Sequence, residues 1–505
     1  MAITIEKQAQ ELQPVYNEMI FVVSSDNASE SNFKFNSDII VDGVTIASIK
    51  YPVNPQGYGV LDVHKHLQSQ ITHDFDLAHD IKYALNSRAI YDVTFSEEFR
   101  PIWTFTDNIG SPQIGFISTT DPTSFFDVGD EIVIEQDAGY TNPSYNGIAT
   151  IVSMAYNAVV SAWQVIINKA TKLSTPAEGG TLYLSNYRTK VYPVEHTLTD
   201  KVAFNGVNDF IDFIDWDSDL YTKTDVSAPP VGKFMSTLPV IASGITNAPE
   251  QIDYKLRRNS KLLLQGYEMA YNYIEVVVDS VHYVLQYTYN ANGKLLYFPL
   301  GVDDINSQDA YVWVGGVLDP VTQPIIPVGT KSYQVFGYNS IPTSVEQGLT
   351  KKGYVINIDE DTCSVYEDIQ LVFLDKLGSF VPFHFDLVNR NTKSVNRTNY
   401  QSDYGQYAPA SNSWTYNTYD RGVKNLDTQV TDIYTINSNW VNQNVSNWLM
   451  ELVTSPEVYW IKVDGTTVAI NLTTNNIERK QVINDQIINY TFSFELSNKN
   501  RQQNG

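Results

Sequence analysis

The feature that most constrains this chain is a repeated pattern of short runs in which apolar and polar residues alternate. Between residues 33 and 46 the apolar side chains alternate with polar ones on either side of Asp42-Gly43. Alternation of period two buries one face of a strand, and Asp-Gly adopts the positive φ angles of a tight hairpin turn. Between residues 112 and 186, short strand-like runs recur about every ten residues, with turn residues between them. The chain is therefore predicted to be mainly β.

The pattern favours several small β-sandwich or barrel modules, followed by a C-terminal α+β unit with a helix on an antiparallel sheet. Changes in alternation and in proline, glycine and polar content mark the boundaries between them. The predicted segments are an N-terminal β-sandwich with a short helix (1–110), an inserted small β-barrel (111–187), an extended connector with a short helix (188–262), a Tyr-rich β-sandwich (263–388), a polar arm or loop (389–430) and a C-terminal helix with a β-sheet (431–505).

One helix is predicted near the C-terminus. Asn437 or Ser438 is the expected N-cap, and Ser455-Pro456 is expected to end the helix. Between them lies a stripe of apolar residues at helical spacing, and we predict that Trp448 packs this helix on the sheet that follows. The members of the stripe are Trp440, Val441, Val445, Trp448, Leu449, Leu452 and Val453.

Charge and cysteine content exclude several classes of protein. The chain has 33 basic and 57 acidic residues, a formal net charge of −24, which argues against a general nucleic-acid binder. Its single cysteine, Cys363, excludes an internal disulfide framework and Cys-based zinc or iron–sulfur sites. We expect no secretory signal, because the N-terminus lacks a basic region followed by an apolar stretch and a small-residue cleavage site. We expect no membrane span, because no window approaches 18 consecutive apolar residues. The largest basic cluster, residues 255–261, is interpreted as ion-pair partners of acidic neighbours rather than as a phosphate site.

The residues that could form metal-binding or catalytic motifs do not have the spacing that these motifs require. His64 and His66 point about 200° apart on a helix, so the cluster that they form with His73 and His79 is not predicted to bind a metal. The run from Asp215 to Asp219 resembles the start of a calcium loop but lacks its glycine and its bidentate glutamate. No nucleotide-binding or nucleophile motif occurs. We therefore predict no catalytic, cofactor or metal site, although counting cannot exclude a glycosidase carboxylate pair.

Exposed aromatic residues are the strongest candidates for a binding site. Residues 400–419 are rich in Tyr and otherwise polar, so this segment cannot bury its rings by itself. Two interpretations remain open: a protein–protein interface, in which Tyr and Trp are enriched, and a surface that stacks on sugars. We favour the interface, formed by Tyr400, Tyr404, Tyr407, Trp414, Tyr416 and Tyr419.

Two stretches carry a resemblance to a known family. The first is FVVSSDNASESNFKFNSDIIVDGVTIASIKYPVNPQGYGVLDVHKHL, near the N-terminus. The second runs from IQLVFLDKLGSFVPFHFDLVNR through YDRGVK to YTINSNWVNQNVSNWLMELVTSPEVYWIKVDGTTVAINL. The resemblance covers roughly 40% of the chain, at its two ends. Both stretches resemble virion structural proteins of tailed phages of Bacteroidetes bacteria, including crAss-like phages.

The resemblance implies a ring-forming component of the tail, neck or baseplate, and it supplies no functional residues to carry over. The expected partners are copies of the same chain and other tail or neck proteins, with no nucleic-acid specificity and no membrane. The expected localisation is the virion, assembled in the cytoplasm of the host bacterium, and no catalysis is expected. The alternatives are a receptor- or glycan-binding tail protein that uses exposed aromatics and a polysaccharide-degrading enzyme.

Overall fold

A computed structural model describes residues 3–75, 78–109, 115–136, 147–168, 179–222, 233–241, 248–267, 273–286, 294–314, 317–322, 324–338, 349–360, 366–474, 476–477 and 488–498. The protein is mainly β, with 52% strand and 8% helix, which confirms the predicted fold class. The residues form two compact units. Unit 1 comprises residues 1–13, 18–69 and 89–203, and unit 2 comprises residues 14–17, 70–88 and 204–505. No described helix is long and apolar enough to cross a bilayer.

The predicted N-terminal hairpin is confirmed. Strands β4 (Lys34–Val41) and β5 (Val44–Tyr51) pair with Val41 opposite Val44. Asp42 and Gly43 between them have φ angles of 48° and 78°, the positive values that a tight two-residue hairpin turn requires. Alternate residues of β4 are buried, as the sequence pattern predicts. The other elements of this part are β1 (Ile3–Lys7), β2 (Leu12–Pro14), β3 (Ile20–Ser25), β6 (Gly59–Asp62), α1 (His64–Gln68), β8 (Arg88–Phe99), β16 (Lys190–Val191) and β17 (His196–Phe204).

The predicted inserted barrel is an open seven-stranded antiparallel sheet. Its strand order is β10-β11-β14-β13-β12-β15-β9, and within the described residues this sheet does not close into a barrel. The sheet curls around its own apolar core, which includes Trp103, Phe105, Phe116 and Phe126. The strands are β9 (Ile102–Phe105), β10 (Asp107–Ile109), β11 (Gly115–Ser118), β12 (Glu131–Gln136), β13 (Gly147–Asn157), β14 (Ala162–Asn168) and β15 (Gly180–Leu184), followed by the 3-10 turn η1 (Ser185–Tyr187).

The segment predicted as an extended connector contains strands of two different sheets. β17 lies between β2 and β8 in a six-stranded sheet, and β19 (Glu250–Arg257) pairs in parallel with β27 (Leu349–Asp359). Burial along β17 does not alternate, because only its last three residues are buried and they are consecutive. The strand therefore lacks the period-two pattern that identifies strands elsewhere in the sequence. The remaining elements of the segment are α2 (Phe210–Ile214), α3 (Asp219–Thr222) and β18 (Val240–Ile241).

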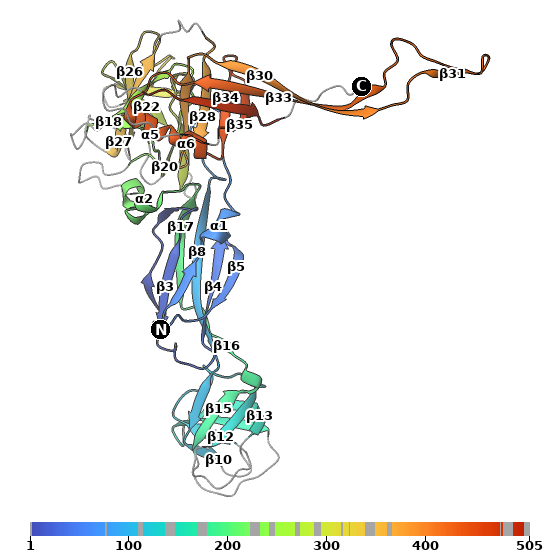
Figure 1. The fold of residues 1–505 in the computed structure, drawn as a ribbon. Helices are drawn as coiled ribbons and strands as arrows, with labels where there is room; N and C mark the ends of the chain where they lie inside the picture. Colours follow the sequence, from blue (N-terminus) through green and yellow to red (C-terminus); the bar gives the residue numbers. More distant parts are fainter. Residues whose placement is uncertain are drawn as a thin grey trace. The chain divides into compact units, whose positions relative to one another are not determined.

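Unit 2 contains two large sheets that share one apolar core (Figure 1). The eight-stranded sheet has the order β18-β19-β27-β26-β21-β22-β24-β25. The ten-stranded sheet has the order β30-β33-β36-β35-β34-β28-β29-β20-β23-β7, so it joins strands from segments that the sequence pattern separates. The elements introduced here are β7 (Lys82–Tyr83), β20 (Leu263–Tyr267), β21 (Tyr273–Val278), β22 (Val281–Gln286), β23 (Leu295–Pro299), α4 (Val302–Ser307), β24 (Ala310–Val314), β25 (Val317–Pro320), β26 (Ser332–Tyr338), β28 (Ile369–Leu374), β29 (Phe380–Phe385), β30 (Arg390–Gln401), β33 (Val423–Asn437), β34 (Val458–Ile461), β35 (Thr467–Leu472) and β36 (Thr491–Leu496).

The predicted C-terminal helix is two short helices, α5 (Gln443–Trp448) and α6 (Met450–Thr454). The expected cap at Asn437 or Ser438 is wrong, because Asn442 caps α5 by accepting a hydrogen bond from the Val445 amide. The predicted burial of Trp448 is confirmed, since this residue is only 4% exposed and packs on Phe373 of β28.

Candidate functional site

Residues 389–430 (the arm) form an antiparallel ribbon with a second, small hairpin at its tip. β30 and β33 pair from Arg390 opposite Thr435 to Gln401 opposite Val423. Only the C-terminal end of β33 continues into the ten-stranded sheet, through its pairing with β36. The tip hairpin consists of β31 (Gln406–Ala408) and β32 (Ser413–Thr415). Figure 1 shows the ribbon extending away from the sheet that it begins in.

The arm has no apolar core of its own. All twelve residues of β30 are exposed, and all six aromatic residues of the predicted interface are among the exposed large side chains. Their exposed fractions run from 41% at Tyr400 to 79% at Tyr419. A two-stranded ribbon is only marginally stable in water, because it buries little apolar surface. The arm therefore displays aromatic rings that a binding partner can cover.

The structure brings several of the predicted interface residues together at the tip. The ring centroids of Tyr404 and Tyr416 lie 5.4 Å apart, and those of Trp414 and Tyr416 lie 6.5 Å apart. The indole Nε1 of Trp414 donates a hydrogen bond to the Tyr404 carbonyl at 3.2 Å, and Tyr407 pairs opposite Trp414. Gly405 permits this arrangement, because a Cβ there would lie 2.4 Å from Trp414 Nε1.

The arm also differs from the rest of the chain in charge. It carries five basic residues (Arg390, Lys393, Arg397, Arg421 and Lys424) and three acidic residues (Asp403, Asp420 and Asp427), whereas the whole chain has a net charge of −24. Lys393 pairs with Asp432 on β33 at 2.8 Å, and this contact raises the pKa of the lysine. The arm can therefore stack rings on a partner and attract a surface of negative charge.

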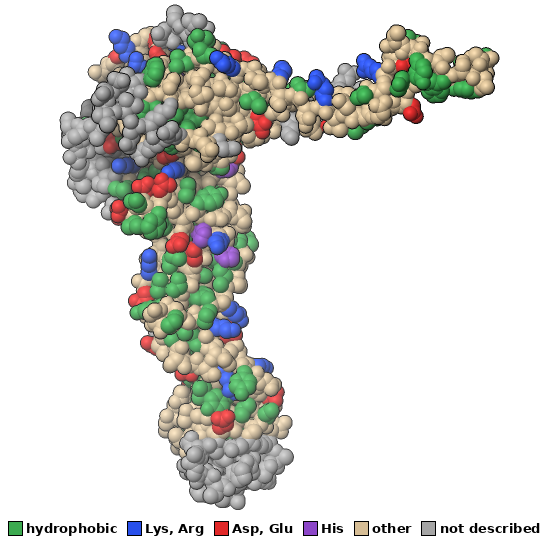
Figure 2. All heavy atoms as spheres, viewed as in Figure 1, with side chains coloured by type: hydrophobic (Ala, Val, Ile, Leu, Met, Phe, Trp, Pro, Cys, Tyr) green, Lys and Arg blue, Asp and Glu red, His purple; other side chains and the backbone are tan. Residues whose placement is uncertain are grey.

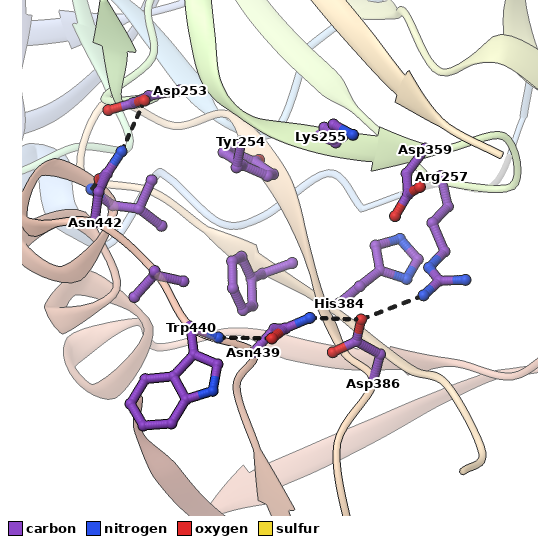
Figure 3. A pocket seen from close by; sticks show the side chains of 13 residues that line it. Asp253, Tyr254, Lys255, Arg257, Asp359, His384, Asp386, Asn439, Trp440 and Asn442 are labelled. Carbon is purple, nitrogen blue, oxygen red and sulfur yellow. Dashed lines mark hydrogen bonds and ion pairs between the residues drawn. The ribbon is translucent and has the colours of Figure 1, made fainter. Parts of the chain in front are cut away.

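Two residues of the predicted basic cluster, Lys255 and Arg257, line a pocket of unit 2 with a volume of about 480 Å³ (Figure 3). Arg257 lies between Asp368, at 3.3 Å, and Asp386, at 3.5 Å. Arg258 pairs with Glu360, and Lys261 pairs with Asp304. These contacts agree with the interpretation of the cluster as ion-pair partners. In Figure 3 the indole of Trp440 points away from the charged side chains, and Asp386 lies between Arg257 and Asn439.

Ser260, His384 and Asp368 form a chain of hydrogen bonds beside this pocket. The amino-acid sequence alone did not predict this arrangement. Ser260 Oγ lies 2.8 Å from His384 Nε2, and His384 Nδ1 lies 3.0 Å from Asp368 Oδ2. Such a relay activates a serine for acyl transfer when a substrate carbonyl can reach the hydroxyl. Ser260 is only 2% exposed and is not among the residues that line the pocket. The relay therefore ties the turn before β20 to β29.

Two carboxylates share a second cleft of unit 2, lined by residues that include Asp375 and Glu451. Asp375 accepts hydrogen bonds from the amides of Leu377 and Ser379 through Oδ1, and from Ser236 and Thr237 through Oδ2. Burial raises the pKa of Asp375 to about 6. Four donors occupy both oxygens, so this carboxylate fixes the turn between β28 and β29.

The histidines considered as metal ligands have separate partners. His64 Nδ1 lies 2.7 Å from Asp62, His79 Nδ1 lies 2.7 Å from Asp304, and the Asn205 amide donates to His73 Nδ1 at 2.7 Å. Over the part of the chain that the structure describes, no group of three or more His, Cys, Asp or Glu side chains is arranged to hold a metal ion. Cys363 lies outside the described residues.

Comparison with protein-family models found no family that matches this chain, and comparison with curated proteins found no matching relative.

Proposed function

We propose that this chain is a structural component of a tailed-phage virion, located in the tail, neck or baseplate, where identical copies form a ring. Its partners are other copies of itself and adjoining virion proteins, and its role is to hold subunits together without catalysis. Assembly takes place in the cytoplasm of the infected bacterium. The resemblance of the two ends of the chain to virion proteins of crAss-like phages favours this function.

The observation that carries the proposal is the arm. A ribbon with one strand exposed at all twelve positions, tipped by Tyr404, Trp414 and Tyr416, buries too little to be stable by itself. Tyr and Trp are the residues that most often dominate protein interfaces, because their rings bury a large area with little loss of conformational freedom. Strand extensions that order against neighbours suit a protein that holds subunits in a closed assembly.

Two measurements test this function. Mass spectrometry of purified virions of the phage that encodes the chain should detect it in stoichiometric amounts, and electron microscopy of the purified chain should show rings of uniform diameter. Absence of the chain from virions contradicts the proposal.

A second function is favoured by the half-exposed Trp414, whose indole, beside Tyr416, can stack on a sugar ring. In this case the chain is a glycan-binding tail protein. Glycan-array binding that is lost in Trp414→Ala but retained in Trp440→Ala, another exposed tryptophan, would support it.

A further inference from the structure

A second surface of unit 2 has properties that complement the arm. The α2 segment (residues 207–219) contains a five-residue helix in which no residue is buried. Phe210, Ile211 and Ile214 on this helix are 78%, 75% and 66% exposed. Several large apolar side chains exposed side by side mark an interaction site in a soluble protein. The α2 segment is therefore an exposed apolar surface to which a partner can bind.

The start of the α2 segment also forms one wall of the cleft that contains Glu451. This cleft has a volume of about 510 Å³, and Val207, Met450 and Pro456 are among its lining residues. A volume of this size accepts one or more aromatic side chains. The α2 segment thus borders, through Val207 and Asp209, a cavity that can receive a ring from a partner.

Charge indicates which partner fits. The α2 segment carries five aspartates and no lysine or arginine, whereas the arm carries five basic and three acidic residues. Opposite charges on two apolar surfaces steer their association and fix its register. The acidic residues of the α2 segment are Asp209, Asp212, Asp215, Asp217 and Asp219.

The same charges argue against pairing of two arms along β30. Every charged residue of β30 is basic (Arg390, Lys393 and Arg397), so an arm-to-arm ribbon joined through these edges would place like charges together. Within one copy, the arm and the α2 segment are both exposed, so neither covers the other. Figure 2 shows hydrophobic side chains (green) on the outer part of the arm, open to a partner.

We propose that the arm of one copy docks on the α2 segment of the next copy, with aromatic residues of the tip entering the adjacent cleft. This inference rests on the proposed function, because it names the contact that builds the ring. Each copy donates one arm and accepts another, so the interface is head-to-tail and produces a ring when the rotation between copies closes.

Charge reversal in the full chain tests the pairing. The arm variant carries Arg397→Glu and Lys424→Glu, and the α2 variant carries Asp212→Lys and Asp215→Lys. The oligomeric state is measured by sedimentation velocity, and folding is checked by thermal unfolding of each variant. Wild type should form one closed oligomer, and each double variant should be a folded monomer. The quadruple variant, which reverses the charges of both the arm and the α2 segment, should form the oligomer again.

The outcomes separate this inference from the proposed function. If both double variants still form the wild-type oligomer, the copies assemble through other surfaces and the arm–α2 contact is wrong, while the ring function stands. If the folded quadruple variant stays monomeric, the contact is also wrong. A wild-type chain that is monomeric in solution but present in virions contradicts the arm–α2 contact, while the virion role stands. A monomer that is absent from virions contradicts both proposals.

Discussion

Glu451 is a carboxylate whose pKa is shifted both by burial and by a neighbouring charge. Burial, together with the nearby carboxylate of Asp375, raises its pKa to about 7. Thr237 donates a hydrogen bond to its Oε2 at 2.6 Å. Because the pKa in the folded state is above that of the unfolded chain, the folded state binds the proton more tightly. The stability from this group is complete below about pH 4.5 and is lost as the pH rises through 7.

The variant Glu451→Gln should remove this dependence. At pH 8 we expect it to be more stable than wild type by about 2 kcal/mol, because the buried charge is absent, and at pH 4 the two proteins should be equal. Denaturant unfolding at both pH values measures the difference. Glu367→Gln, at an exposed position of the same unit, serves as the control and should show no such pH-dependent gain. A uniform loss of stability in Glu451→Gln at both pH values contradicts the argument.

Trp448 supports a second prediction at the residue scale. Its indole packs on Tyr254, Phe373 and Phe383, at centroid distances of 5.1, 5.2 and 6.2 Å. Trp448→Ala should cost about 3–5 kcal/mol of unfolding free energy, because it leaves a cavity among these rings. Trp440→Ala, at an exposed tryptophan in the same region, should change stability by less than about 0.5 kcal/mol. Chemical denaturation of both variants makes the comparison, and equal losses would refute the assigned packing.

At the scale of elements, the sequence predicts a helix or strand correctly where neighbouring residues alone determine the backbone conformation. The β4–β5 hairpin is predictable because Asp42-Gly43 supplies the positive φ angles and the flanking residues alternate. The start of α5 is not predictable in the same way. Ser438 has the side chain of a good cap, but its backbone amide donates to the Tyr490 carbonyl and its hydroxyl accepts from the Tyr490 amide. A contact between residues 52 positions apart therefore decides where the helix begins.

The observed cap of α5 can be tested directly. The Asn442 side chain accepts from the Val445 amide and donates to Asp253 at 2.8 Å. Asn442→Ala should destabilise unit 2 by about 1 kcal/mol, because both bonds are lost. Asn442→Ser keeps an oxygen for the cap and should recover about half of this loss. Thermal unfolding gives the values, and an unchanged melting temperature for Asn442→Ala would exclude Asn442 as a stabilising cap.

At the scale of the whole molecule, composition predicts the mainly β class and the exposed aromatic arm, but long-range contacts remain hidden. The ten-stranded sheet contains both β7, which begins at residue 82, and β36, which ends at residue 496, and no local pattern shows that these strands belong to one sheet. The Ser260–His384 contact spans 124 positions for the same reason. The aromatic residues of the arm are predictable because a polar segment of that composition cannot bury them. The short helix of the connector is predicted and corresponds to α2, but the sequence does not show that its apolar residues are exposed.

The last prediction follows from the arm being separable from the core of unit 2. Replacing residues 396–429 with Asn-Gly joins Val395 to its register partner Val430 through a tight turn. The unfolding free energy should change by less than about 1 kcal/mol, since the removed strand residues pack on no core. This shortened chain should be monomeric. Mixed with the α2 variant it should form only a one-to-one dimer, because one chain supplies the intact arm and the other supplies the intact α2 segment. Sedimentation velocity detects that dimer, and a shortened chain that assembles alone to the wild-type size contradicts the prediction.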